Sequence, residues 1–101
     1  DTETTDINGY AIEISLIIAN LDETTKEFEP ISYFATAVNP TVPVNPRVKK
    51  IFGIDENALQ EFPTFKELWK EKLEELFKTA DIIVAHNIPF DLTVLQRELN
   101  R

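Results

Sequence analysis

Three carboxylates stand where they could act together on a metal ion. Asp1 and Glu3 are two residues apart, and Asp91 follows the run VAHNIPF late in the chain. On an extended segment, residues two apart project from the same face, so Asp1 and Glu3 would bring two like charges together. A divalent cation relieves such repulsion, because carboxylates are hard oxygen ligands. The pair alone is a weak signal, and by itself it favours a solvated acidic terminus.

Asp91 is placed more informatively than the other two carboxylates. The apolar run at 82–85 predicts a strand buried on both faces, and Pro89 predicts the first turn of a helix that runs to about residue 100. Asp91 would then lie at the carboxyl end of a strand, where α/β sheets place ligands. A charge complement to the helix N-terminus is the competing explanation. His86 and Asn87 fall at the same edge, and we expect His86 to be a hydrogen-bonded structural residue.

The first half of the chain predicts a pair of antiparallel strands. Asn8-Gly9 is a strong hairpin signal, because both residues tolerate positive φ. The apolar and β-branched run that follows predicts a strand at about 10–19, and a second strand is expected at about 31–38. The polar residues from Asp22 to Thr25 would form the turn between them. An antiparallel meander is the simplest arrangement.

Two helices are expected between the meander and the late strand. Asn45 followed by Pro46 is typical of a helix start, and Gly53 is placed to end a helix near 46–52. Thr64 and Glu67 form a capping box for a helix near 65–79. The apolar residues of this second helix follow a 3.6-residue period, which predicts that one face packs on the sheet. They are Phe65, Leu68, Trp69, Leu73, Leu76 and Phe77.

Length and charge restrict the kind of protein. With 101 residues and 43% hydrophobic content, the chain forms at most one domain. The net charge of −8 argues against a broad basic surface for nucleic acid, and divalent cations gathered by carboxylates are one other way to hold a phosphate partner. The absence of cysteine excludes disulfides and thiolate metal sites. No stretch is apolar enough to cross a membrane, and we expect a cytoplasmic protein.

Two motifs carry a resemblance to a known family. DTETT at 1–5 and AHNIPFD at 85–91 resemble the first and second motifs of the DEDD superfamily of 3′-to-5′ exonucleases. The likeness is greatest to the epsilon-type proofreading exonuclease of bacterial DNA polymerase III. It implies an α/β, RNase H-like exonuclease fold, here incomplete, whose mixed sheet has an antiparallel meander followed by helices and a parallel strand.

The resemblance implies a role for each matching residue. Two Mg²⁺ or Mn²⁺ ions would be held by Asp1, which bridges both, by Glu3 at the first ion, and by Asp91 at the second ion through water. The 3′-terminal nucleotide would be bound by four further residues, Thr4, Thr5, Asn87 and Phe90. The implied substrate is a single-stranded 3′ end of DNA or RNA, and the implied partner is a DNA polymerase subunit.

The chain also departs from the family pattern. A third motif, which carries a histidine general base and a fourth carboxylate, does not occur in residues 1–101. Asp6 stands where relatives have a glycine, and Phe52 where many have a histidine. We therefore expect residues 1–101 to be a partial exonuclease domain, truncated at both ends and inactive in isolation.

Two other functions compete with an exonuclease. A non-catalytic nuclease-like binding module would share the fold, but it gives no reason for keeping Asp1, Glu3 and Asp91 together. An RNase H-like endonuclease would use similar acidic metal chemistry, but it does not explain the pairing of His86-Asn87 with Phe90-Asp91.

Overall fold

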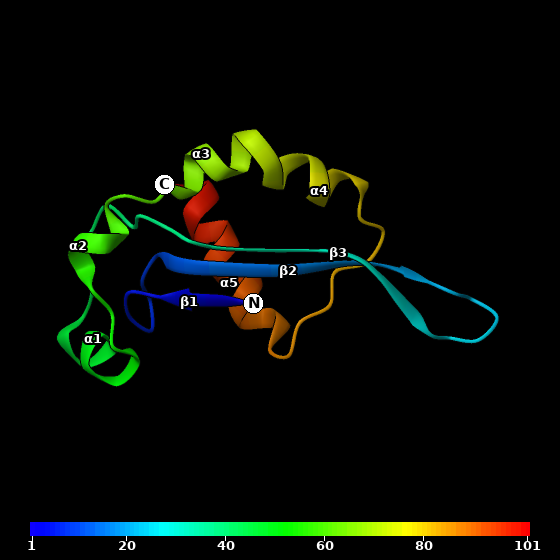
Figure 1. Ribbon diagram of the computed structural model, residues 1–101, viewed down its shortest axis with the longest axis horizontal. Coiled ribbons are helices and arrows are strands. Elements are labelled where there is room, and N and C mark those ends of the chain that lie inside the picture. Colours follow the sequence, from blue (N-terminus) through cyan, green and yellow to red (C-terminus); the bar gives the residue numbers. More distant parts are fainter.

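The computed structural model describes residues 1–101 as a three-stranded sheet with helices packed around it (Figure 1). The elements in chain order are the strands β1 (Thr2–Thr4), β2 (Ala11–Leu21) and β3 (Phe28–Ala37), then the helices α1 (Pro46–Phe52), α2 (Glu56–Leu59), α3 (Phe65–Leu68), the π-helical turn η1 (Trp69–Leu73), α4 (Glu74–Thr79) and α5 (Ile88–Leu99). The α/β class is therefore confirmed.

The sheet is the expected antiparallel meander. Its strand order is β1-β2-β3, and both neighbouring pairs are antiparallel. Thr2 lies opposite Ile14, and Leu16 lies opposite Phe34, so these side chains share the face toward the helices. Ile17 lies on the other face and is exposed. Alternating burial along the strands therefore decides which side chains of β1 can meet α5.

The main core lies between this sheet, the helix that begins at Phe65, and α5. Seven buried residues form it: Ala11, Ile14, Val38, Phe65, Leu68, Leu73 and Val94. A smaller cluster of Ile12, Val44 and Leu59 joins the sheet to the α1–α2 region. Burying one such aliphatic side chain contributes about 1.5–3 kcal/mol, so the main core fixes how α5 sits on the sheet.

The capping signals of the sequence place the helices correctly. The Asn45 side chain accepts a hydrogen bond from the Arg47 N–H at the start of α1, and Gly53 ends that helix with φ 64°. Thr64 caps α3 by accepting from the Glu67 N–H. The helix expected at 65–79 is continuous through α3, η1 and α4, with a π-helical turn in its middle.

The expected strand at 82–85 is wrong. This segment has no regular structure, and Ile82, Ile83 and Val84 are 66%, 47% and 74% exposed. A strand needs a neighbour for its backbone groups. Beside β1 the available edge is only three residues long, and there the Thr2 N–H is already bonded to Asp91. The sheet thus has no parallel strand, and the mixed sheet expected from the resemblance is replaced by an antiparallel one.

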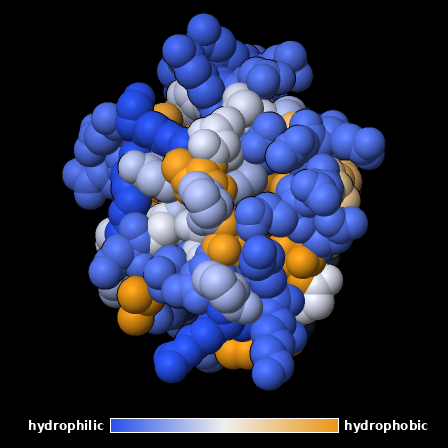
Figure 2. Space-filling model, turned by 90° about the vertical axis from the view of Figure 1, so that its left-hand side faces the viewer, coloured by the Kyte–Doolittle hydropathy of each residue, from blue (hydrophilic) through white to orange (hydrophobic).

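The outer end of the β2–β3 hairpin extends beyond the helices (Figure 1). The molecule measures 48 × 27 × 22 Å along its principal axes, which reflects this arm. At the opposite end, around α1 and α2, the surface is mostly hydrophilic, and its hydrophobic side chains form small separate groups (Figure 2). None of the helices has the length and apolar content needed to cross a membrane.

Candidate active site

Asp91 connects the two sequence motifs through one buried contact. Its Oδ1 accepts hydrogen bonds from the Thr2 N–H at 3.1 Å and from the Thr2 Oγ1 hydroxyl at 2.7 Å. Both residues are buried, with Asp91 8% exposed. Hydrogen bonds to a charged group contribute about 1.5–3 kcal/mol each, which offsets much of the cost of burying the carboxylate. The first turn of α5 is therefore fastened to β1.

The three candidate carboxylates lie in two different environments. Thr2 faces the core with its neighbour Ile14, whereas Asp1 and Glu3 are exposed. Alternation along a strand sends side chains one residue apart to opposite faces. Because Asp91 bonds to the Thr2 hydroxyl, its carboxylate lies on the core side of β1. Asp1 and Glu3 therefore project from the face of β1 opposite to that of the Thr2 side chain, and their joint action with Asp91 stays a prediction.

The donor types suit a hard cation, but their arrangement does not form a site. No three side chains among His, Cys, Asp and Glu are grouped closely enough to hold a metal ion. Glu3 lies directly opposite Glu13 on β2, a like-charge pair that is unfavourable across a sheet. Metal binding by Asp1, Glu3 and Asp91 would require their side chains to move, and it stays a prediction.

The two paired threonines shape the loop between β1 and β2. The Thr5 hydroxyl accepts from the Tyr10 N–H at 3.1 Å, and the Thr4 hydroxyl donates to the Asp6 carbonyl at 2.7 Å. Gly9 closes this loop, but its φ is not positive, unlike the expected hairpin turn. A Cβ at Gly9 would lie 2.1 Å from the Thr5 Oγ1. Glycine is required here for close approach, and the threonines serve the loop in this structure.

Asp6, which replaces the usual glycine, joins the same loop to α1. Its carboxylate accepts from the Asn45 side-chain amide at 3.0 Å and from the Ile7 N–H at 2.8 Å. The hydrogen bond from Asn45, followed by that from Ile7, lowers the pKa of Asp6 below its ordinary value. Asp6 is fully exposed, so the contribution to stability is small.

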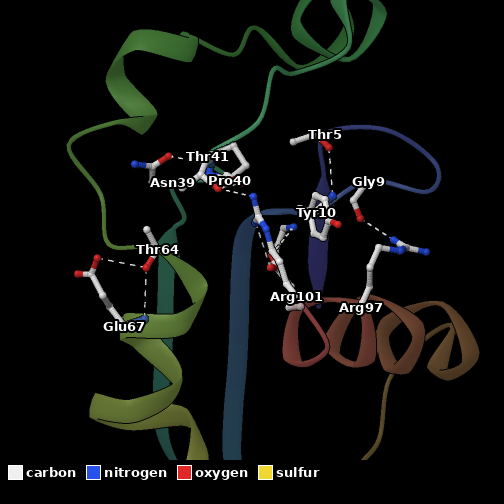
Figure 3. A network of polar contacts seen from close by, with 12 residues as sticks. Thr5, Gly9, Tyr10, Asn39, Pro40, Thr41, Thr64, Glu67, Arg97 and Arg101 are labelled. Atoms are coloured by element: carbon white, nitrogen blue, oxygen red, sulfur yellow. Dashed lines mark hydrogen bonds and ion pairs between the residues drawn. The ribbon is translucent and has the colours of Figure 1, made fainter.

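The last turns of α5 hold the other end of the loop. The Glu98 carboxylate, which is buried, accepts from the Ala11 N–H at 2.9 Å through Oε2. The Arg97 guanidinium donates to the Gly9 carbonyl, and the Arg101 guanidinium lies 4.0 Å from the Tyr10 ring centroid (Figure 3). Both ends of helix α5 are therefore hydrogen-bonded to the β1–β2 hairpin.

Two of the four predicted nucleotide-binding residues line a common depression. It has a volume of about 380 Å³ and lies between loop residues Ile7 and Asn8 on one side and α5 on the other. Asn87 and Phe90 belong to its wall, whereas Thr4 and Thr5 do not. The structure thus brings together Asn87 and Phe90 but does not join them to the threonines.

Sequence reasoning missed Thr2 and Glu98 and misjudged His86. His86 is exposed, and nothing in the structure gives it the expected structural role. The sequence held a signal for Glu98, because residues 91, 94 and 98 are spaced to share one face of a helix. An acidic residue in line with the buried Val94 must be hydrogen-bonded if it too is buried. Thr2 had no local signal, since its partner is 89 residues away.

A comparison with known protein families identifies the family of the chain. The family model described as Exonuclease, of the RNase T type, matches residues 1–101, the whole chain. The chain belongs to this exonuclease family. The resemblance drawn from the two motifs, to DEDD exonucleases of the DNA polymerase III type, is confirmed.

Individual relatives of this exonuclease domain are far longer proteins. The chain is 31% identical over 104 residues to a PolC-type DNA polymerase III of Caldanaerobacter subterraneus subsp. tengcongensis, a match that covers 100% of the chain and 7% of the relative. It is 28% identical over 99 residues to the PolC-type DNA polymerase III of Clostridium perfringens, covering 98% of the chain and 6% of that protein. The chain spans less than a tenth of the length of the curated relatives it matches.

Proposed function

We propose that this exonuclease-family domain contributes to metal-dependent hydrolysis of phosphodiester bonds from the 3′ end of a single DNA strand, as a proofreading activity associated with a DNA polymerase. The observation that carries the proposal is the contact between Asp91 and Thr2, because it fastens the second motif directly to the strand that bears the first. RNA remains the alternative substrate, and a cytoplasmic location stays a prediction.

Asp1, Glu3 and Asp91 are the residues that would hold Mg²⁺ or Mn²⁺. Two such ions would activate a water molecule and stabilise the charge on the phosphate and the leaving oxygen. In the present arrangement Thr2 occupies Oδ1 of Asp91, which leaves Oδ2 without a protein hydrogen bond and available to a ligand. Glu3 and Asp1 are exposed and free to turn toward a cation.

Asn87 and Phe90 are the residues that would receive the 3′-terminal nucleotide. The Asn87 side chain makes no capping bond at the start of α5, so its amide can donate and accept toward a base or sugar. Phe90 offers a half-buried aromatic surface in the same depression. Aromatic side chains bind bases by stacking without regard to sequence, as a proofreading activity requires.

The chain by itself is expected to be inactive. Its single histidine, His86, precedes α5, and no further histidine could serve as general base. Positioned general-base catalysis is worth typically 10²- to 10⁴-fold. A non-catalytic binding module is the competing function. The observation that favours it is that Asp1 and Glu3 are exposed and form no group of three potential metal ligands with Asp91.

The test is degradation of a 5′-labelled single strand in Mg²⁺ or Mn²⁺. Three proteins are compared: residues 1–101, a longer protein in which the same residues are followed by the third motif of the family, and that longer protein with Asp1→Ala. We expect shortening from the 3′ end only with the second protein. Inactivity of the longer protein would favour the binding module, and activity that survives Asp1→Ala would contradict the assigned metal ligand.

A further inference from the structure

Helix α5 presents a continuous stripe of side chains to the depression that Asn87 and Phe90 line. Phe90, Thr93 and Arg97 are three and four residues apart, a spacing that stacks side chains on one helix face. The loop residues Ile7 and Asn8 form the opposite wall. The stripe leads from an aromatic ring at the start of the helix to a guanidinium about 10 Å further along its axis.

Arg97 is the only charged residue that lines the depression. No carboxylate neutralises its charge, because Arg97 takes part in none of the three salt bridges. Its guanidinium makes a single hydrogen bond, to the Gly9 carbonyl, as the one dashed line from it in Figure 3 shows. A guanidinium has five N–H donors and stays charged. Most of its donors are therefore available to an anion.

The rest of the depression limits what that anion can be. Ile7 and Phe90 provide apolar surface, and Asn87 provides an amide with no capping bond. A ligand that satisfies all of these features has a flat apolar part with polar edges and carries a phosphate some distance away. Arginine binds phosphate in a forked geometry that matches its donors. These are the features of a short nucleic-acid strand.

We propose that Arg97 binds a backbone phosphate of the nucleic-acid strand whose terminal nucleotide lies against Asn87 and Phe90. The assignment rests on the proposed function, because it takes the same strand as ligand. It adds a residue outside both sequence motifs and gives the strand a direction along α5. Arg97 thus has two tasks: it supports the loop through Gly9, and it supplies the positive charge that the rest of the depression lacks.

The experiment measures binding of a fluorescein-labelled oligothymidylate by anisotropy, without divalent metal, across a series of salt concentrations. Four variants are compared with the unaltered chain: Arg97→Gln, Arg97→Lys, Asn87→Ala and Lys70→Gln. Lys70→Gln is the matched control, because Lys70 is an exposed cation on η1 that forms no salt bridge and lies away from the depression.

We expect Arg97→Gln to weaken binding about tenfold and to reduce the salt dependence by about 0.7, the contribution of one single-strand phosphate contact. Arg97→Lys should keep the salt dependence with a smaller loss of affinity. Asn87→Ala should weaken binding without changing the salt dependence, and Lys70→Gln should change neither quantity. If Arg97→Gln does not fold, the contrast between Arg97→Lys and Asn87→Ala carries the test.

Distinct outcomes separate a failure of this inference from a failure of the proposed function. Binding that keeps its salt dependence in Arg97→Gln, or that Lys70→Gln weakens equally, would overturn the Arg97 assignment alone. So would an Arg97→Lys variant that loses the salt dependence. No binding by the unaltered chain at low salt would overturn the assignment together with the nucleic-acid substrate.

Discussion

The β1–α5 junction and the segment that leads into it differ in hydrogen bonding and in burial. At the junction, Asp91 is bonded twice to Thr2, and Val94 is packed at 1% exposure. In the segment from Ala80 to His86, three consecutive apolar residues are open to solvent. A helix satisfies its own backbone hydrogen bonds and needs only one buried stripe, whereas a strand needs a second strand. The start of α5 is therefore anchored to β1, whereas the segment directly before it has no strand to pair with.

The largest expected effect compares the same substitution in the two regions. Val94→Ala should lower the free energy of unfolding by about 2 kcal/mol, because two methyl groups leave a packed core. Val84→Ala should change it by less than about 0.5 kcal/mol, since Val84 is 74% exposed. Urea denaturation of both variants provides the measurement. Equal losses would mean that the segment at 82–85 is buried, as the sequence pattern had predicted.

A smaller effect is expected when the junction loses one hydrogen bond. Thr2→Val removes the hydroxyl that donates to Asp91 and keeps the size of the side chain, so we expect a loss of about 1–2 kcal/mol. Thr2→Ser keeps the hydroxyl and should therefore lose much less stability than Thr2→Val. Thr36→Val is the matched control, because the Thr36 hydroxyl bonds only to the neighbouring Ala37 carbonyl. If Thr36→Val costs as much as Thr2→Val, the contact with Asp91 contributes nothing specific.

The smallest effect concerns the loop that α5 holds against the sheet. Asn45→Ala removes the main cause of the lowered pKa of Asp6, so that pKa should rise toward 3.8. A carboxyl whose folded pKa is lowered stabilises the fold above its unfolded pKa, and this stability is lost as pH falls through the folded value. The measurement is an NMR titration of the Asp6 carboxyl in both proteins. An unchanged pKa in the variant would show that Asn45 does not bind Asp6 in solution.

Features encoded locally could be predicted from the sequence. Asn45 with Pro46, Thr64 with Glu67, and Pro89 each marked a helix start correctly, because a cap and its helix are adjacent in the chain. The β2–β3 hairpin followed from its own strands and turn. The prediction of a strand at 82–85 was wrong, because a strand forms only where another strand offers a free sheet edge.

The local positions of the candidate residues could be predicted from the sequence, but the way in which they meet could not. The first-turn position of Asp91 and the common exposed side of Asp1 and Glu3 followed from helix and strand geometry. That Thr2, rather than Asp1 or Glu3, meets Asp91 depends on the face that β1 turns to α5. The bond from Glu98 to the Ala11 N–H depends on the same packing. Neither contact can be predicted from the sequence of a single helix or strand, because each joins two elements that are far apart in the chain.

The central claim is that function resides where α5 meets β1, and Mn²⁺ titration followed by NMR tests it most directly. A paramagnetic ion broadens signals from nuclei near its binding site, and the acidic turn around Asp22 and Glu23 serves as an internal control. We predict that the amide signals of Thr2, Glu3 and Asp91 broaden first, and that Asp91→Asn reduces this effect. Equal broadening at Asp22 and Glu23, or broadening at the junction that Asp91→Asn leaves unchanged, would contradict the account.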